Sequence, residues 1–128
     1  MNAQAAAPAP SGANALTEIE DLTKVRFPAG ATLIHHDRAR DSDALVRAKL
    51  RMTVEQWSSF QAALQLHVDA FSEDKRYLLG INDGWWNPAE VAMLPTAQIQ
   101  LPDAKVLNLG VDRSDPQQLL VYLVWHAT

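Results

Sequence analysis

The most regular alternation of apolar and polar residues runs through the stretch ALVRAKLRM, residues 44–52. One set of alternate positions holds Ala44, Val46, Ala48, Leu50 and Met52. The other set holds Leu45, Arg47, Lys49 and Arg51. Successive side chains of a strand point to opposite faces, so this pattern predicts a half-buried β-strand with a basic outer face. The stretch ATLIHHD predicts a strand before it, and the polar RARDSD connects the two.

The residues from Thr53 onward have the signature of a helix start. Gln56 follows Thr53 at the spacing in which each side chain satisfies the backbone amide of the other. Apolar residues then recur at helical spacing: Trp57, Phe60, Ala63, Leu64 and Val68. The pattern predicts a helix of about fourteen to eighteen residues with its apolar face on the sheet. Its end is open, because HVDAFSEDKRY either extends the helix through Phe71 or forms a loop. A shorter helix is predicted earlier in the chain by Leu16, Ile19 and Leu22.

The C-terminal third predicts three further strands. AQIQL alternates as a short edge strand does, and KVLNLGVD follows it. The turn DRSDPQQ leads into the last strand, LLVYLVWHA, which is apolar on both faces. Such a strand is typical of the centre of a sheet that is covered on both sides. One helix layer covers a single face, so the second cover is either the short segments around Trp85 or another protein chain.

The stretch GINDGWWNPAEV places two tryptophans side by side. Asn87 and Pro88 are typical of a helix start, with Asn87 as the N-cap and Pro88 in the first helical position. Trp86 then precedes the cap and pairs with Val91 as a hydrophobic staple, so we interpret Trp86 as structural. Trp85 points the opposite way, which makes it the candidate for a partner contact. The alternative is that Trp85 covers an edge of the core.

Together, these elements predict an α+β domain over residues 15–128. It is a two-layer sandwich in which a mainly antiparallel sheet of four to five strands carries one main helix on one face. Residues 1–14, MNAQAAAPAPSGAN, have no charged side chain and the Ala/Pro-rich composition of a disordered tether. Such leaders commonly join a removed export signal or lipid anchor to a folded domain. A periplasmic or otherwise exported protein is therefore one expectation, and a cytoplasmic protein with a disordered N-terminus is the other.

Composition narrows the class of protein. Of the 128 residues, 48% are hydrophobic and 20% are charged, as in ordinary globular domains. Cysteine is absent, which excludes disulfides, thiolate metal sites and a cysteine nucleophile. The net charge of −4 gives no overall attraction to nucleic acid or anionic lipid. No apolar run is long enough to predict a transmembrane segment.

Candidate catalytic chemistry is sparse. His35, His36 and Asp37 stand together, but neighbouring strand residues point to opposite faces and their spacing is not that of a zinc site. The serines lie in no nucleophile motif, and the glycines form no phosphate loop. Five aspartates are predicted at turns, where Asp is favoured for its backbone hydrogen bonds: Asp37, Asp41, Asp43, Asp112 and Asp115. We therefore predict no metal, no cofactor and no catalytic residue. The alternative is a small hydrolase or isomerase with a pocket beside His35 or His36 and nearby aspartates.

Positive charge gathers on the first hairpin. It holds five of the chain's eleven lysines and arginines: Arg38, Arg40, Arg47, Lys49 and Arg51. One interpretation is a solvated outer face that discourages pairing with other sheets. The other is a docking surface for an acidic protein, in which arginine favours specific and fast association. Nucleic acid is not an expected partner, because no aromatic residues alternate with the basic ones.

The order FPAGATLIHHDR, DALVRAKLRM, a Trp/Phe helix, WWNP, VLNLGVD and LLVYLVW resembles small exported bacterial α+β domains, including lipoproteins of the immunity or inhibitor type. The resemblance spans most of the chain beyond the tether and carries over no functional residue. It implies a periplasmic protein without catalysis that binds and neutralises a secreted effector. The residue patterns place the partner contacts at Trp85 and the five basic residues, and they leave a homodimer through the sheet open.

Overall fold

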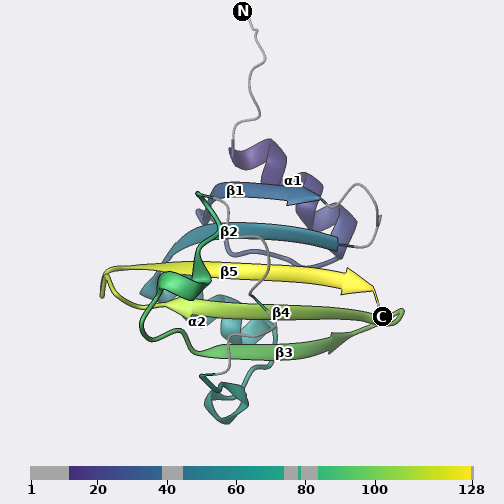
Figure 1. The fold of residues 1–128 in the computed structure, drawn as a ribbon. Helices are drawn as coiled ribbons and strands as arrows, with labels where there is room; N and C mark the ends of the chain where they lie inside the picture. Colours follow the sequence, from purple (N-terminus) through teal and green to yellow (C-terminus); the bar gives the residue numbers. More distant parts are fainter. Residues whose placement is uncertain (1–11, 39–44, 74–77, 79–83, 128) are drawn as a thin grey trace, which may run out of the picture.

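The structure is a computed structural model that describes residues 12–38, 45–73, 78 and 84–127. Its centre is one five-stranded antiparallel sheet with the strand order β1-β2-β5-β4-β3 (Figure 1). The strands are β1 (Thr32–Arg38), β2 (Leu45–Thr53), β3 (Thr96–Leu101), β4 (Lys105–Asp112) and β5 (Gln118–Ala127). The helical elements are α1 (Gly12–Thr23), α2 (Val54–Ala63) and the 3-10 turns η1 (Val68–Ala70) and η2 (Pro88–Glu90). The predicted α+β class and antiparallel sheet are confirmed, and both predicted helices are present. However, α1 has twelve residues and α2 has ten, so α2 is not longer than the first helix as predicted.

β5 lies in the middle of the sheet, as the apolar residues on both of its faces predict. It pairs with β2 on one side and β4 on the other, so that Tyr122 lies opposite Lys49 and also opposite Gly110. β1 and β3 are the edge strands, and α1 lies beside β1 in Figure 1.

The main core lies between the helices and one face of the sheet. On β2 the buried positions are those that the alternation predicts: Val46, Ala48, Leu50 and Met52. Ile19 of α1 packs into the same cluster as Trp57 and Phe60 of α2. Full burial of such a side chain stabilises the fold by about 1.5–3 kcal/mol. The shared cluster therefore holds both helices on this face.

The opposite face carries a smaller core. Tyr122 and Val124 of β5 cluster there with Leu78, Trp86 and Leu94, and all five side chains are more than nine-tenths buried. Of the two predicted covers for the second face of β5, the short segments around Trp85 are the one that the structure shows. This face therefore needs no second chain to bury it.

α2 starts as predicted but ends earlier. The Gln56 amide donates to Thr53 Oγ1 at 3.1 Å, and the Thr53 amide donates to Gln56 Oε1 at 2.9 Å, which confirms the capping box. The helix has ten residues and ends at Ala63. The predicted continuation to Val68 is wrong, because Gln65 has a φ of 57°, outside the right-handed helical region, and Val68 is 73% exposed.

α1 begins at Gly12, inside the range predicted as a tether, and residues 1–11 lie outside the described part of the chain. Its apolar residues Leu16, Ile19 and Leu22 pack against the main core, as their spacing predicts. None of the helices in the described ranges has both the length and the hydrophobicity needed to cross a membrane.

Candidate functional site

The predicted basic residues of β2 lie on the face opposite the helices. Arg47 and Lys49 are half-buried beneath the segment that carries Trp85, whereas Arg51 is exposed. The alternation of β2 explains this placement, because the intervening positions belong to the main core.

The other two basic residues of the predicted surface are at or beyond the end of β1. Arg38 is the last residue of that strand, and its backbone pairs with Val46 of β2. Arg40 lies outside the described residues. The part of the basic hairpin whose side chains the structure describes is therefore the β2 face.

Arg47 makes its contacts within the chain. Its Nε atom donates to Asp37 Oδ1 of β1 at 3.0 Å, and its Nη2 atom pairs with Asp37 Oδ2. The guanidinium carbon lies 5.0 Å from the centre of the Trp85 ring and 5.2 Å from that of Trp86. A cation over an indole face is attracted by the ring quadrupole. Arg47, with 13% of its side chain exposed, thus supports the tryptophan pair from the sheet.

Trp85 is half-buried and rests on the sheet. Its ring stacks on the imidazole of His35 in β1, with 4.2 Å between ring centres and 18° between the planes. It also meets Trp86 edge to face, with 5.6 Å between ring centres. We call the group formed by His35, Asp37, Arg47 and Trp85 the Trp85 surface. It combines a partly exposed aromatic ring with a paired cation.

Lys49 joins the sheet to the segment that carries the tryptophans. Its Nζ atom donates to the Trp85 carbonyl at 3.1 Å and to Asn87 Oδ1 at 3.3 Å. It also lies 5.1 Å from the centre of the Tyr122 ring. Burial lowers the pKa of Lys49, and the negative charge of Asp112 acts in the opposite direction. The hydrogen bond from the Lys49 ammonium group to the Trp85 carbonyl therefore holds the backbone at Trp85 against the sheet.

Asn87 has a different role from the predicted one. Its side chain makes no capping hydrogen bond to η2, so the predicted N-cap interaction is wrong, although Pro88 does begin the turn. Asn87 Oδ1 instead accepts a hydrogen bond from the Tyr122 hydroxyl at 2.8 Å, in addition to the one from Lys49. Leu78 and residues 84–94 lie over this face of the sheet, and we call them the covering segment. The Asn87 amide oxygen therefore connects β2 and β5 to the covering segment.

Tyr122 is the buried centre of this network. It is 1% exposed, and burial raises its pKa to about 12, with the negative charges of Asp112 and Glu90 acting in the same direction. Asp112 Oδ1 accepts hydrogen bonds from the backbone amide of Ser114 at 2.9 Å and from its hydroxyl at 2.6 Å. The phenol therefore stays neutral well above pH 7 and keeps its proton for the hydrogen bond to Asn87.

Trp86 is structural, as predicted. It is 1% exposed, its Nε1 donates to the Leu78 carbonyl at 2.9 Å, and its ring meets Tyr122 edge to face at 5.2 Å between ring centres. Val91, the predicted staple partner, packs against the same cluster. The two neighbouring tryptophans therefore differ, since Trp86 is buried and Trp85 remains partly open to solvent.

Sequence reasoning missed the roles of three residues: Asp37 as the partner of Arg47, Asn87 as an acceptor, and Tyr122 as the donor to Asn87. For Asp37 a signal exists, because a hairpin between the two predicted strands brings it opposite Arg47. The contact between Asn87 and Tyr122 joins positions 35 residues apart, and no local pattern indicates it.

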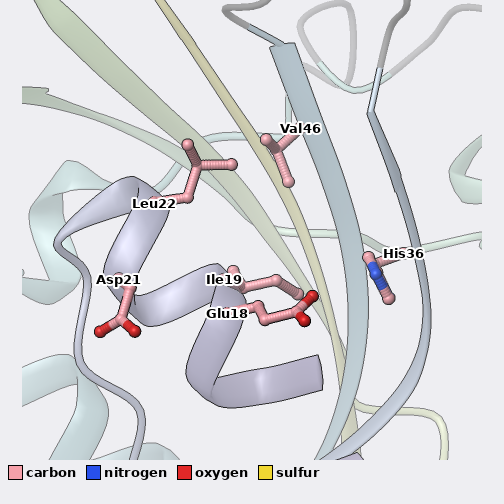
Figure 2. Close-up of a pocket in the computed structure, with 6 residues that line it drawn as sticks. All are labelled: Glu18, Ile19, Asp21, Leu22, His36 and Val46. Atoms are coloured by element: carbon pink, nitrogen blue, oxygen red, sulfur yellow. The ribbon is translucent and has the colours of Figure 1, made fainter. Parts of the chain in front are cut away.

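A second candidate site lies on the helix side, between α1 and the strands β1 and β2. It is an open groove of about 380 Å³, lined by Glu18, Ile19, Asp21, Leu22, His36 and Val46 (Figure 2). The side chains of His35 and His36 lie on opposite faces of the sheet, as strand alternation predicts. His35 stacks on Trp85 on one face, and His36 lines the groove on the helix side. Figure 2 shows the Glu18 carboxylate extending toward the strands that carry Val46 and His36, whereas Asp21 points away from these strands.

Within the described ranges, no group of three or more histidines, aspartates or glutamates is arranged to hold a metal ion. No known protein family, curated protein or solved structure matches the chain. Its function is therefore inferred from the chemistry of these two sites.

Proposed function

We propose that the chain is a noncatalytic protein-binding domain that acts outside the cytoplasm as an immunity or inhibitor protein and neutralises a secreted effector. The Trp85 surface is its contact area. The observation that carries this proposal is the way Trp85 is held. Its ring stacks on His35, and its backbone carbonyl accepts a hydrogen bond from Lys49.

A partly exposed tryptophan in a fixed position suits a binding surface. Tryptophan and arginine are enriched among the residues that contribute most to protein–protein affinity. Affinity also rises when a side chain is ordered before binding, because less conformational entropy is lost. Trp85 and Arg47 meet both conditions, and the Asp37 carboxylate orients the Arg47 guanidinium.

Local charge favours an acidic partner. Arg51 is exposed on the same face of β2 as Arg47 and Lys49, in a chain whose net charge is −4. Positive charge in this region is therefore a local feature. Attraction between a basic patch and an acidic surface speeds association and helps select the partner.

Composition supports the extracytoplasmic location. Residues 1–11, which precede α1 in the sequence, are Ala/Pro-rich and uncharged, as in leaders that join an export signal or lipid anchor to a domain. Fractionation of cells that express the protein from its own gene tests this part of the proposal. We expect the protein in the periplasmic or membrane fraction, and recovery in the cytosol alone would contradict it.

The contact area is tested by affinity capture from the organism that makes the chain, followed by affinity measurements with the purified partner. Trp85→Ala removes the proposed anchor. The matched control is Met93→Ala, which removes a 69% exposed apolar side chain from the same covering segment. We expect Trp85→Ala to weaken binding by about 30-fold or more, as for central interface residues, and Met93→Ala to change it by less than about twofold. Equal binding of the wild type and Trp85→Ala would reject the Trp85 surface.

The alternative function, a small hydrolase or isomerase, is favoured by one observation: His36 lines the groove together with Glu18 and Asp21. An imidazole near a carboxylate is suited to general acid–base catalysis. A substrate screen with the wild type and His36→Asn tests it. Turnover that His36→Asn abolishes, with folding and partner capture unchanged, would establish the enzyme. A chain that captures no partner but turns over a substrate would reject the binding domain.

A homodimer is a separate expectation from the sequence. Since the second face of β5 is covered from within the chain, pairing through the sheet would use an edge strand, β1 or β3. Light scattering distinguishes the two states, because the monomer mass is 14.1 kDa and a dimer has twice that mass.

A further inference from the structure

The groove between α1 and the sheet has the make-up of a site for a small amphiphilic molecule. Its volume of about 380 Å³ falls within the range of small-molecule sites. Ile19 and Val46, at 5% and 2% exposure, are its most deeply buried lining residues, and Leu22 is half-buried beside them. Glu18 is exposed, and its carboxylate extends toward β2 and β1 (Figure 2). An apolar floor with a carboxylate at its mouth matches an apolar body that ends in a cation.

A smaller internal cavity adjoins this groove. Ile19 and Val46 line both spaces, so their side chains form the boundary between them. The inner cavity has about 10 Å³ of free volume, which is room for about one water-sized group. Its lining is apolar apart from Thr23 and the indole of Trp125.

The Trp125 indole borders the inner cavity, so its signal can report on a molecule that enters there. Trp125 is 6% exposed, and its Nε1 has no hydrogen-bond acceptor among the described residues. Trp57 Nε1 is also buried without a partner in this part of the chain, but Trp57 does not line the cavity. Trp125 is therefore placed to respond to a molecule that enters from the groove.

We propose that this groove binds a small organic amine. The ammonium group lies at Glu18, and an apolar chain of about six carbons lies over Ile19 and Leu22 and leads toward Trp125. Asp21 adds negative charge to the same helix, which favours a cation over an anion. The inference does not depend on the protein-binding proposal, because the Trp85 surface lies on the opposite face of the sheet.

The test is a titration of the full, nitrogen-15-labelled chain with n-hexylamine, followed by NMR. We expect the backbone signals of α1 and β1 and the indole signal of Trp125 to move, while the indole signals of Trp57 and Trp85 stay in place. n-Butylamine should bind about 15-fold more weakly, since each buried methylene contributes about fourfold. n-Hexanol, which lacks the charge, should bind about two- to fivefold more weakly than n-hexylamine.

Two variants separate charge from folding. Glu18→Gln should weaken n-hexylamine binding about two- to fivefold and leave n-hexanol binding unchanged. Glu55→Gln is the matched control, because Glu55 is exposed in the first turn of α2 and the variant makes the same change in charge. Circular dichroism shows that each variant is folded.

Three results would overturn the proposal: no movement of the α1 and Trp125 signals, equal affinity for n-hexylamine and n-hexanol, or equal effects of Glu18→Gln and Glu55→Gln. None of these results would contradict the proposal that the Trp85 surface binds a protein. Conversely, Trp85→Ala should not change n-hexylamine binding, so the failure of one proposal is distinguishable from the failure of the other.

Discussion

The Tyr122 hydroxyl donates a hydrogen bond to Asn87 Oδ1 at 2.8 Å, although the two residues lie 35 positions apart. The same oxygen accepts a hydrogen bond from Lys49 Nζ at 3.3 Å. One amide oxygen therefore joins β2, β5 and the segment that carries Trp85. The one helical element of that segment in the described residues is the three-residue turn η2, so side-chain contacts hold the segment on the sheet.

Lys49→Met removes two of these hydrogen bonds and keeps the apolar stem of the side chain. The Trp85 carbonyl and Asn87 Oδ1 lose a charged donor, so we expect the free energy of unfolding to fall by about 1–3 kcal/mol. Arg51→Met is the control, because Arg51 is exposed on the same face of β2, and its effect should stay within about 0.5 kcal/mol. Urea denaturation measures both. If both variants lost the same free energy of unfolding, Lys49 would contribute no more to stability than an exposed cation does.

Tyr122 makes stability depend on alkaline pH. Its pKa of about 12 in the folded chain exceeds the ordinary value of about 10, so folding favours the neutral phenol. This contribution is complete below pH 10 and is lost as the pH rises from about 10 to about 12. At about 1.4 kcal/mol per pKa unit, it amounts to roughly 2–3 kcal/mol.

Tyr122→Phe tests this dependence. The difference in free energy of unfolding between the wild type and the variant should be constant up to about pH 9 and should then fall toward pH 12. Other groups that titrate in this range are present in both proteins, so their contributions largely cancel. Urea denaturation at a series of pH values gives the curve, and a difference that stays flat to pH 12 would exclude a raised pKa at Tyr122.

The neighbouring tryptophans should differ in their contribution to stability. Trp86→Ala empties a site that is 1% exposed and removes the hydrogen bond to the Leu78 carbonyl, so we expect a loss of about 3–5 kcal/mol. Trp85 is half-buried, and Trp85→Ala should cost about 1–2 kcal/mol. Thermal or urea denaturation ranks the two variants. If Trp85→Ala lowered the free energy of unfolding more than Trp86→Ala does, the Trp85 ring would have to be counted as part of the core.

Gly110 permits close packing of the covering segment on β4. A Cβ atom at this position would lie 2.5 Å from Leu78 Cδ1 and 3.1 Å from Leu94 Cγ. Gly110→Ala should therefore displace both leucines and lower the free energy of unfolding by about 1–3 kcal/mol. At Gly84 a Cβ would meet no atom within 4 Å, so Gly84→Ala is the matched control and should have little effect. Indistinguishable melting temperatures would contradict this packing.

Patterns between near neighbours made much of the fold predictable. The alternation in β2 predicts which of its residues are buried, and the two apolar faces of β5 predict its central place. The capping box depends on Thr53 and Gln56, which are three positions apart, and it is confirmed. These features depend on residues close in sequence, so they are visible without the tertiary structure.

The rest depends on distant contacts or on local conformations without a sequence signal. The apolar spacing carries α2 to Val68, but the chain leaves the helix before Gln65, a residue type that gives no stop signal. Asn87 has the sequence context of an N-cap, yet its oxygen accepts from Tyr122 and Lys49, 35 and 38 positions away. The same limit applies to the candidate site, because a basic strand face is visible in the sequence and its contacts with the tryptophans are not.

The order of the strands also bears on how the chain folds during translation. β5 lies between β2 and β4 but is synthesised after both of them. The ladder between β2 and β5 runs from the pair Leu45–His126 to the pair Thr53–Gln118, and contacts this distant in sequence form slowly. Until residues 118–127 leave the ribosome, the inner edge of β2 has no neighbour, and a nascent chain in that state is most in need of a chaperone.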